Sequence, residues 1–337
     1  MLAEEESSKT HDPTFIDDPV LVNDWHVVGL SEELAEGKVT SARLLGENLV
    51  LWRLDGKVSI WRDLCLHRGS KLSLGKVEDR KLVCAYHGWS YDSEGKCVGI
   101  PAHPGQPPPK RAIAQAYNSK EQYGYIWACL GDPSKNAVPN FPEWNDHAFR
   151  KIYCGPYHSN ASGPRLVENF LDVAHLPFVH EGLLGDREHA EINDYNVVTD
   201  PNGITASGIK IWQPDPDGRG VGAPVTYTYK VFRPLTAYFT KEASKQGFAI
   251  FMSITPVAQS ESLMWMIIAM NYAHDTQDNQ IRSFEDKVVG QDMRVVESQR
   301  PELLPVDLQA ELHLRSDRTA IAYRKWLNEL GLSFGTS

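Results

Sequence analysis

The chain has 337 residues, of which 42% are hydrophobic and 23% are charged, and its formal net charge at pH 7 is −10. This length suits two ordinary domains, and the composition is that of a globular protein with a hydrophobic core. No apolar run is long enough to span a membrane as a helix. The acidic balance argues against nucleic acid as a partner.

The N-terminus and the cysteines indicate where the protein works. Residues 1–19 contain three consecutive glutamates and lack the apolar stretch of a signal peptide. We therefore expect a disordered tail on a cytoplasmic protein that does not contact membranes. Five cysteines are an odd number, which argues against a disulfide framework. Two of them belong to the motif described below, and Cys97, Cys129 and Cys154 should be free, mostly buried thiols.

Short alternating apolar runs separated by Gly, Asp and Pro fill residues 20–142 and predict an all-β domain. Residues 49–54 and 58–61 flank Asp55-Gly56, which is the signature of a hairpin with a type I′ turn. Turn-forming residues accumulate just before Pro142, and we place the domain boundary there.

Residues 143–332 alternate between β-rich and helical patterns. The β-rich stretches predict an antiparallel sheet, and they cover residues 204–212, 225–232, 248–256 and 263–272. Helices are expected over residues 166–175, about 280–299 and 315–330. The last helix has Ser316 as its expected N-cap and Gly331 just past its end. The chain as a whole is therefore predicted to be an α+β protein.

Two pairs of cysteine and histidine are the most informative feature of the first half. They are Cys65-Leu66-His67 and Cys84-Ala85-Tyr86-His87. Two thiolates and two imidazoles suit a [2Fe–2S] cluster in which Cys65 and Cys84 bind one iron while His67 and His87 bind the other. Imidazole in place of thiolate raises the reduction potential, so such a cluster accepts electrons readily.

A structural zinc site is the alternative, because the same four side chains would satisfy tetrahedral Zn²⁺. Zinc modules usually group two cysteines and then two histidines, whereas each pair here mixes the two residue types. Loop-forming residues follow each pair, at 68–70 and at 88–90, as expected for two loops that hold a cluster from opposite sides. Trp89 is expected to shield the cluster, although an ordinary core tryptophan explains it equally well.

A second set of polar residues begins the other half. Asn169, Asp172 and His175 recur every three residues, so on a helix they share one face. His180 follows His175 by five residues, and Pro177 between them would break the helix and let both rings turn to one point. Two histidines and a carboxylate on one face of Fe(II) leave open positions for O₂.

Asp292 is the candidate for that carboxylate. It lies on the apolar stripe that Phe284, Val288 and Val295 would form on the helix around residues 286–299. A carboxylate on a face that points to the core is costly unless it is paired or bound to a metal. A salt bridge or a helix cap in the core is the alternative.

Asp172 and Asn169 have separate expected roles. Asp172 can accept a hydrogen bond from the free ring N–H of His175 and so orient that ligand, unless it is a plain surface acid. Asn169 could hydrogen-bond the substrate or a water at the iron, or it could be a helix-packing amide. Phe251, Trp265 and Met266 are guesses for residues that line the pocket, because strand periodicity does not tell which side of the sheet each one faces.

Residues 65–69 and 84–89 closely resemble the Rieske family of [2Fe–2S] domains. The pattern N-x-x-D-x-x-H-x₄-H, followed further along by residues 291–299, is similar to the catalytic domain of Rieske non-haem iron oxygenases. The likeness runs from Asp24 to Leu330. It implies a Rieske [2Fe–2S] domain over residues 20–142 and a helix-grip (START-like) antiparallel sheet with helices over residues 143–332.

The resemblance also implies roles for residues and for the assembly. His175, His180 and Asp292 correspond to the ligands of the mononuclear iron. Asp172 corresponds to a carboxylate that reaches the cluster ligand matching His87 on a neighbouring subunit. The small members of this family form homotrimers, in which electrons pass between subunits.

The sequence therefore predicts the terminal oxygenase of a multi-component monooxygenase. It would insert one atom of O₂ into a C–H bond of a small cyclic substrate, alkaloid-like or heterocyclic, by hydroxylation or by N- or O-demethylation. No nicotinamide or flavin motif is recognisable, so electrons from NAD(P)H should arrive through a separate reductase, a ferredoxin or both. The chain is as short as the demethylases and single-site hydroxylases of the family. It resembles cyanobacterial saxitoxin-tailoring Rieske hydroxylases, in residues 316–331 and 100–104, and bacterial methylxanthine N-demethylases.

Other functions remain open at this point. A cis-dihydroxylating aromatic-ring dioxygenase would use the same two iron centres. A Rieske electron carrier would need only the first half of the chain, and the segment from Asn169 to His180 argues against it. A ligand-binding protein with a zinc-stabilised head is the non-redox alternative.

Overall fold

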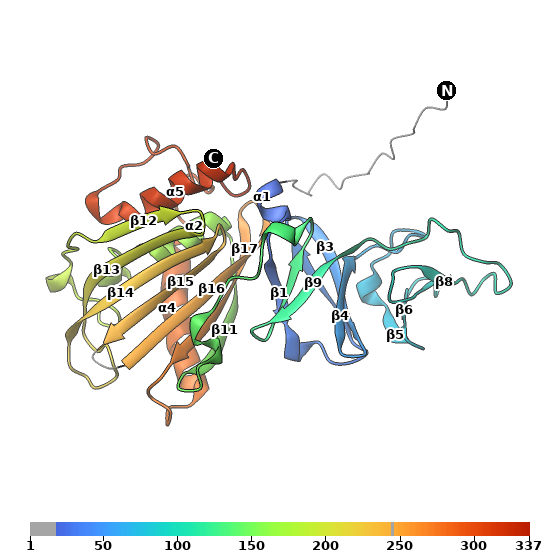
Figure 1. Ribbon diagram of the computed structural model, residues 1–337, viewed down its shortest axis with the longest axis horizontal. Helices are drawn as coiled ribbons and strands as arrows, with labels where there is room; N and C mark the ends of the chain where they lie inside the picture. Colours follow the sequence, from blue (N-terminus) through green and yellow to red (C-terminus); the bar gives the residue numbers. More distant parts are fainter. Residues whose placement is uncertain (1–17, 244–245) are drawn as a thin grey trace.

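Strands dominate both halves of the computed structural model, which describes residues 18–243 and 246–337 (Figure 1). Most of the expected tail, residues 1–19, lies outside the described residues. Asp18 caps the first helix, α1 (Pro19–Val22), by accepting hydrogen bonds from two of its backbone N–H groups. Among the described helices, none is both long and apolar enough to cross a bilayer.

The first half contains a six-stranded sheet in the order β1-β10-β9-β4-β3-β2. Its strands are β1 (His26–Leu30), β2 (Val39–Leu44), β3 (Glu47–Leu54), β4 (Lys57–Arg62), β9 (Ala116–Gln122) and β10 (Tyr125–Cys129). The predicted β3–β4 hairpin is confirmed. Asp55 and Gly56 in its turn have φ of 53° and 72°, and a type I′ turn requires a positive φ at both central positions.

A smaller sheet of four strands extends from this domain, in the order β5-β6-β7-β8. Its strands are β5 (Lys76–Glu78), β6 (Lys81–Val83), β7 (Ser90–Tyr91) and β8 (Cys97–Gly99). Both cysteine–histidine pairs lie in loops next to these strands. Figure 1 places this small sheet at the end of the molecule that is farthest from the second half of the chain.

The second half is built on a seven-stranded antiparallel sheet in the order β11-β17-β16-β15-β14-β13-β12. Its strands are β11 (Arg150–Ser159), β12 (Asn196–Asp200), β13 (Gly203–Gln213), β14 (Ala223–Arg233), β15 (Thr236–Ala243), β16 (Gln246–Ala258) and β17 (Glu261–Met270). The four predicted strands correspond to β13, β14, β16 and β17, and the predicted α+β class is confirmed.

The sequence did not predict three strands of this sheet, namely β11, β12 and β15. The reason is clearest in β11, where Gly155 and Pro156 interrupt the alternating pattern. The pairing of β11 with β17 shifts register between Cys154 and Tyr157. A bulge of this kind accommodates both residues within one strand, although their sequence resembles a turn.

The helices differ from the prediction at their ends. They are α2 (Gly163–Leu171), α3 (Leu176–Val179), α4 (Asp278–Val296) and α5 (Arg318–Leu330). The helix expected over residues 166–175 stops at Leu171, so Asn169, Asp172 and His175 do not share one helix face. Gly331 ends α5 in the left-handed conformation as predicted, but the N-cap is Asp317 and not Ser316.

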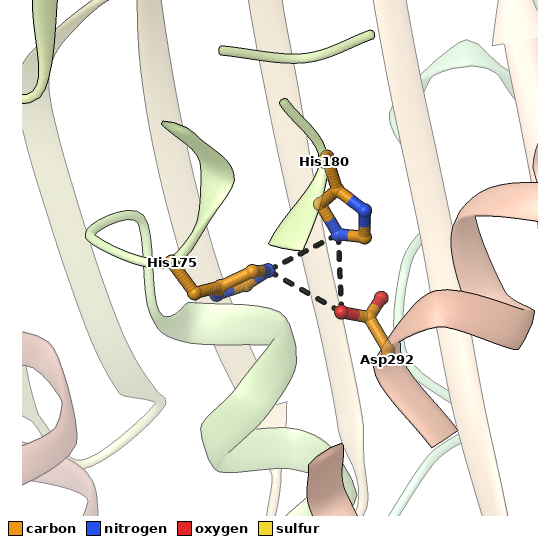
Figure 2. Close-up of side chains that lie close together, drawn as sticks. All are labelled: His175, His180 and Asp292. Carbon is orange, nitrogen blue, oxygen red and sulfur yellow. Dashed lines mark hydrogen bonds and ion pairs between the residues drawn. The ribbon is translucent and has the colours of Figure 1, made fainter. Parts of the chain in front are cut away.

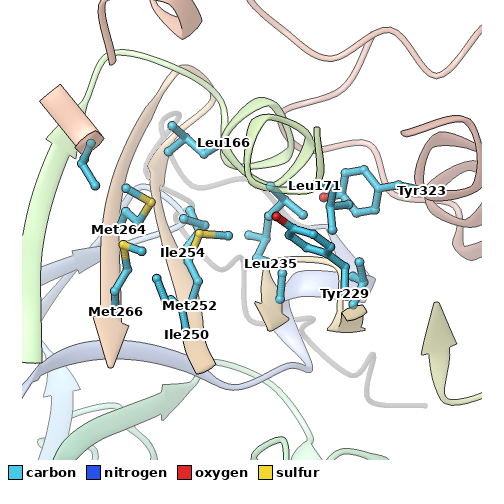
Figure 3. Packing of buried hydrophobic residues seen from close by; sticks show 14 of the residues in the cluster. Leu166, Leu171, Tyr229, Leu235, Ile250, Met252, Ile254, Met264, Met266 and Tyr323 are labelled. Carbon is cyan, nitrogen blue, oxygen red and sulfur yellow. The ribbon is translucent and has the colours of Figure 1, made fainter. Parts of the chain in front are cut away.

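Strands β16 and β17 separate two apolar environments. Phe251 and Trp265 face the first domain, where they pack against Tyr125 and other aromatic residues. Met264 and Met266 face the opposite side, toward α2 (Figure 3). The guess that Phe251 and Trp265 line the pocket was therefore wrong, because neighbouring residues on a strand point to opposite faces.

A buried ion-pair network attaches α2 to α5. The guanidinium of Arg324 on α5 donates two hydrogen bonds, of 2.6 and 2.8 Å, to the carboxylate of Glu168 on α2. Arg324 also bonds Glu311, which accepts a 2.8 Å bond from Arg165. The side chains of Arg165 and Arg324 are only 2% and 3% exposed. This network positions the end of α2, from which the chain continues to His175 and His180.

Replacing Arg324 by Met should lower the free energy of unfolding by about 3 kcal/mol, because it leaves the carboxylate of Glu168 buried without its main partner. The matched control is Arg315→Met, which breaks an exposed pair with Asp194 and should cost about 0.5 kcal/mol or less. Urea denaturation followed by circular dichroism measures both losses. Equal losses in the two variants would show that the buried network adds nothing to stability.

Candidate active site

Three potential ligand atoms meet between α2, α3 and α4. Nε2 of His180 lies 3.0 Å from Oδ1 of Asp292, and Nε2 of His175 lies 3.4 Å from the same oxygen. The two Nε2 atoms are 3.3 Å apart (Figure 2). Ligands at about 2.1 Å from one metal ion, at right angles to each other, are about 3 Å apart. The three side chains therefore have the spacing of ligands around one ion.

The break between α2 and α3 allows this convergence. Asp172 leaves the helical conformation with ψ of 122°, and its Oδ1 accepts a 2.8 Å hydrogen bond from the backbone N–H of Ala174. His175 then precedes the short helix α3, and His180 follows it. Pro177 lies in the first turn of α3, a position where its missing N–H has no cost. The prediction that Pro177 breaks the helix between the two histidines was therefore wrong, because the break is at Asp172.

The electrostatics of the group favour a cation. Oδ1 of Asp292 is buried and accepts no hydrogen bond within the described part of the chain. Burial alone would lower the pKa of His180, but the nearby carboxylate of Asp292 and the amide of Gln291 outweigh burial and raise that pKa above its ordinary value. A metal ion at this point would satisfy the carboxylate and both rings at once, and the donor set of two histidines and one carboxylate suits iron.

Gln291 is a site residue that the sequence analysis missed. Its Oε1 lies 2.9 Å from Nδ1 of His180, so the amide accepts the N–H of that ring and leaves Nε2 free to bind a metal. Asp172 lies beside His175, with 3.4 Å between its Oδ2 and Nδ1 of the ring, but the predicted hydrogen bond between them is not formed. The sequence signal for Gln291 is that it directly precedes Asp292, at the start of the stretch 291–299 that resembles the oxygenase family.

The helix face that carries Asp292 was predicted one position out of register. Phe284 and Val295, expected to be buried, are 44% and 42% exposed. The buried residues of α4 are instead Glu285, Val288, Val289 and Val296. Because Glu285 is charged, this buried face does not form a continuous apolar stripe in the sequence, and the stripe was assigned one position away.

The two cluster loops share one backbone conformation. In the first loop, the N–H of Cys65 bonds the carbonyl of Ser70, and the N–H of Gly69 bonds the carbonyl of Cys65. In the second, Cys84 bonds Trp89 and Gly88 bonds Cys84 in the same way. Gly69 and Gly88 have φ of 71° and 69°, a conformation that other residues adopt only with strain. Each of the two loops therefore holds one cysteine and one histidine in the same backbone conformation.

The surroundings of these loops suit a two-iron cluster. Cys65 and Cys84 are each 2% exposed, and the Tyr91 hydroxyl lies 3.3 Å from the sulfur of Cys65. The ring of His67 packs edge-on to His87 and stacks on Trp89 at 4.6 Å between ring centroids. The four ligand atoms do not converge on one point, whereas those of His175, His180 and Asp292 all lie within 4.8 Å of one another. One tetrahedral zinc ion would require such convergence.

A cavity of about 480 Å³ opens beside the group of His175, His180 and Asp292. Asn169 and Asp172 line it, as does Met266, which the sequence analysis had guessed. Most other lining side chains are apolar or aromatic, and they come from α2, α4 and strands β14 to β17. The volume and the lining suit a small organic molecule.

The fold and the two metal sites define the oxygenase component of a two-centre iron enzyme. Residues 24–117 match the Rieske [2Fe-2S] domain, and residues 159–332 match the vanillate O-demethylase oxygenase C-terminal domain. The chain belongs to the Rieske non-haem iron oxygenases. Its cofactors are accordingly a Rieske [2Fe–2S] cluster and a mononuclear iron.

Demethylases are among the similar proteins. The chain is 32% identical to methylxanthine N1-demethylase NdmA of Pseudomonas putida over 323 residues, covering 91% of this chain and 88% of that one. It is 26% identical to the vanillate O-demethylase oxygenase subunit of Pseudomonas sp. (strain HR199 / DSM 7063), covering 91% and 94%. The solved structure of NdmA from Pseudomonas putida CBB5 with caffeine superimposes with a TM-score of 0.82 at 31% identity, covering 92% and 91%.

Replacing Gln291 by Leu should lower the affinity for Fe(II) about 10- to 100-fold, because the N–H of His180 loses its acceptor and the ring loses its orientation. Gln291→Glu keeps an acceptor and should keep the affinity within a few-fold. Competition with a chelator under anaerobic conditions measures both, and the visible absorption of the cluster reports correct folding. Unchanged affinity in Gln291→Leu would exclude this role.

Proposed function

We propose that the protein is the terminal oxygenase of a multi-component Rieske monooxygenase that acts on a small cyclic, alkaloid-like or heterocyclic substrate. The observation that carries the proposal is the convergence of His175, His180 and Asp292 beside a largely apolar cavity. One atom of O₂ enters a C–H bond of the substrate, and the other leaves as water with two electrons and two protons. Oxidation of an N- or O-methyl group in this way releases formaldehyde.

Each site residue has a proposed part in this reaction. His175, His180 and Asp292 hold the mononuclear iron, which supplies the chemistry of O₂ activation when bound. Cys65, Cys84, His67 and His87 hold the [2Fe–2S] cluster, and Trp89 covers one face of His67. Asn169 lines the cavity and orients the substrate through its amide.

Electrons reach the cluster from NAD(P)H through a separate reductase, a ferredoxin or both. We assign the protein to the cytoplasm, where a soluble electron donor is available. All five cysteines of the chain are buried and none forms a disulfide, which fits a reducing compartment.

A homotrimer with electron transfer between subunits is the proposed assembly. The small sheet beside the cluster loops and helix α4, which carries Asp292, lie in opposite halves of the molecule (Figure 1). We therefore propose that a second chain brings its cluster close to the iron. His87 is exposed at the tip of its loop. Tyr86 beside it is 65% exposed, and Phe178, on α3 between the two iron-binding histidines, is 53% exposed. These apolar side chains suit a contact between the cluster end of one subunit and the iron end of the next.

Asp172 is placed to connect the two centres, because its carboxylate lies beside His175 and is 39% exposed. Replacing it by Asn should lower turnover about 100-fold while the absorption of the cluster and the iron content stay normal. Asp186→Asn is the matched control, since Asp186 also precedes a histidine, His189, by three residues and lies 3.8 Å from its ring, outside the cavity. Normal turnover in Asp172→Asn would exclude the proposed route.

A single turnover with labelled O₂ tests the reaction itself. The iron-loaded protein is reduced chemically and exposed to ¹⁸O₂ with N-methyl heterocycles, cationic alkaloids and simple aromatics in turn. We expect one labelled oxygen in a product, or loss of a methyl group with formaldehyde. Two labelled oxygens in one product would instead mean a cis-dihydroxylating dioxygenase, and the proposed monooxygenase reaction would be wrong.

A further inference from the structure

A second carboxylate of α4 faces the cavity. Glu285 precedes Asp292 by seven residues, which is two helical turns, so the two side chains lie on the same face of α4. Glu285 lines the cavity and is only 7% exposed. Within the described residues, no hydrogen bond and no ion pair of 4.0 Å or less reaches its carboxylate.

The charged form of this carboxylate is unfavourable in the folded protein. Burial and the nearby negative charge of Asp292 together raise the pKa of Glu285 to about 7. The positive charges of His180 and Lys241 oppose it only in part. A buried carboxylate without hydrogen-bond donors is unfavourable. A ligand that donates hydrogen bonds to it would therefore gain binding free energy.

Lys241 is near enough to be considered as a partner, but other groups hold it. Its ammonium group donates hydrogen bonds to Oε1 of Gln213 at 3.3 Å and to the carbonyl of Pro216 at 3.1 Å. It also lies 5.0 Å from the centroid of the Phe248 ring, within the range of a cation–π contact. Lys241 is therefore stabilised away from Glu285, and the carboxylate remains available.

The charged residues that line the whole cavity also favour a cationic ligand. Four carboxylates line it, those of Asp172, Asp215, Glu285 and Asp292, whereas Lys241 is the one lysine or arginine among its described lining residues. A bound metal ion would neutralise Asp292 but not the others. A low-dielectric cavity with this excess of carboxylates attracts cations.

We propose that Glu285 binds a cationic nitrogen group of the substrate, a guanidinium or a protonated amine, and thereby fixes which carbon faces the iron. This inference rests on the proposed function in one respect, because it takes the cavity to be the substrate site. The cation's N–H groups donate to the carboxylate, while the apolar walls formed by residues such as Val289 and Met270 pack against the carbon skeleton. Guanidinium suits a carboxylate especially well, since two parallel hydrogen bonds can form.

Calorimetric binding of phenylguanidine and phenylurea to the protein loaded with both metal centres tests this assignment. The two probes have nearly the same shape, but only phenylguanidine is cationic. We expect the wild-type protein to bind phenylguanidine at least tenfold more tightly than phenylurea above the pKa of Glu285. Glu285→Gln should bring the two dissociation constants within about twofold of each other, because it removes the charge and keeps the shape.

Two further variants complete the design. Asp286→Asn is the control, since Asp286 is the next residue on α4 but its carboxylate accepts a 2.7 Å bond from Tyr157 outside the cavity, and the preference should survive. Glu285→Met places an apolar chain of similar length beside Val288 and Val289, and it should abolish the preference even if the Gln variant does not fold.

Three outcomes would overturn the assignment. They are equal binding of both probes by the wild-type protein, no binding of either probe, and a preference that persists in both Glu285 variants. The binding assay uses no O₂ and no reductant, so its outcome is independent of turnover. Failure of the labelled-oxygen experiment would overturn the proposed reaction and leave the charge preference intact, and the converse also holds.

Discussion

Three lone-pair-bearing atoms, on His175, His180 and Asp292, lie within 3.0 to 3.4 Å of one another, and this arrangement is favourable only with positive charge between them. The rest of the catalytic domain maintains it. The buried pair of Arg324 and Glu168 holds α2 against α5, so the chain leaves α2 at a defined point. The seven-stranded sheet supports α4 on the other side of the cavity. Stability and function therefore depend on the same contacts.

The two metal sites use different means to orient their ligands. The cluster loops rely on backbone hydrogen bonds and on glycines with positive φ, so residues close in sequence set the conformation of each loop. The mononuclear site relies on side chains from separate elements, with Gln291 and Asp172 beside the two histidines. The first kind of site is local in sequence, whereas the second exists only after the domain has packed.

Helix α4 carries both a metal-ligand candidate, Asp292, and the proposed substrate-binding residue, Glu285. Asp292 near its C-terminal end belongs to the group suited to iron, and Glu285, two turns earlier, faces the same cavity with no partner among residues 18–243 and 246–337. The rigid helix sets the distance between these two carboxylates. A substrate bound at Glu285 would therefore lie at a fixed distance from Asp292. Substitutions near Glu285 can change which substrate binds without changing the metal ligands.

The sequence by itself determined what depends on local patterns. The cysteine–histidine loops, the Asp55-Gly56 hairpin, the end of α5 at Gly331 and four strands of the large sheet could be predicted, because each follows from neighbouring residues. Only the tertiary structure decided that Gln291 orients His180, that Glu285 faces the cavity, and that Phe251 and Trp265 point away from it. These features depend on which face of a helix or strand packs against which neighbour. A cavity lined partly by charged residues does not produce the apolar periodicity by which a buried face is recognised in a sequence.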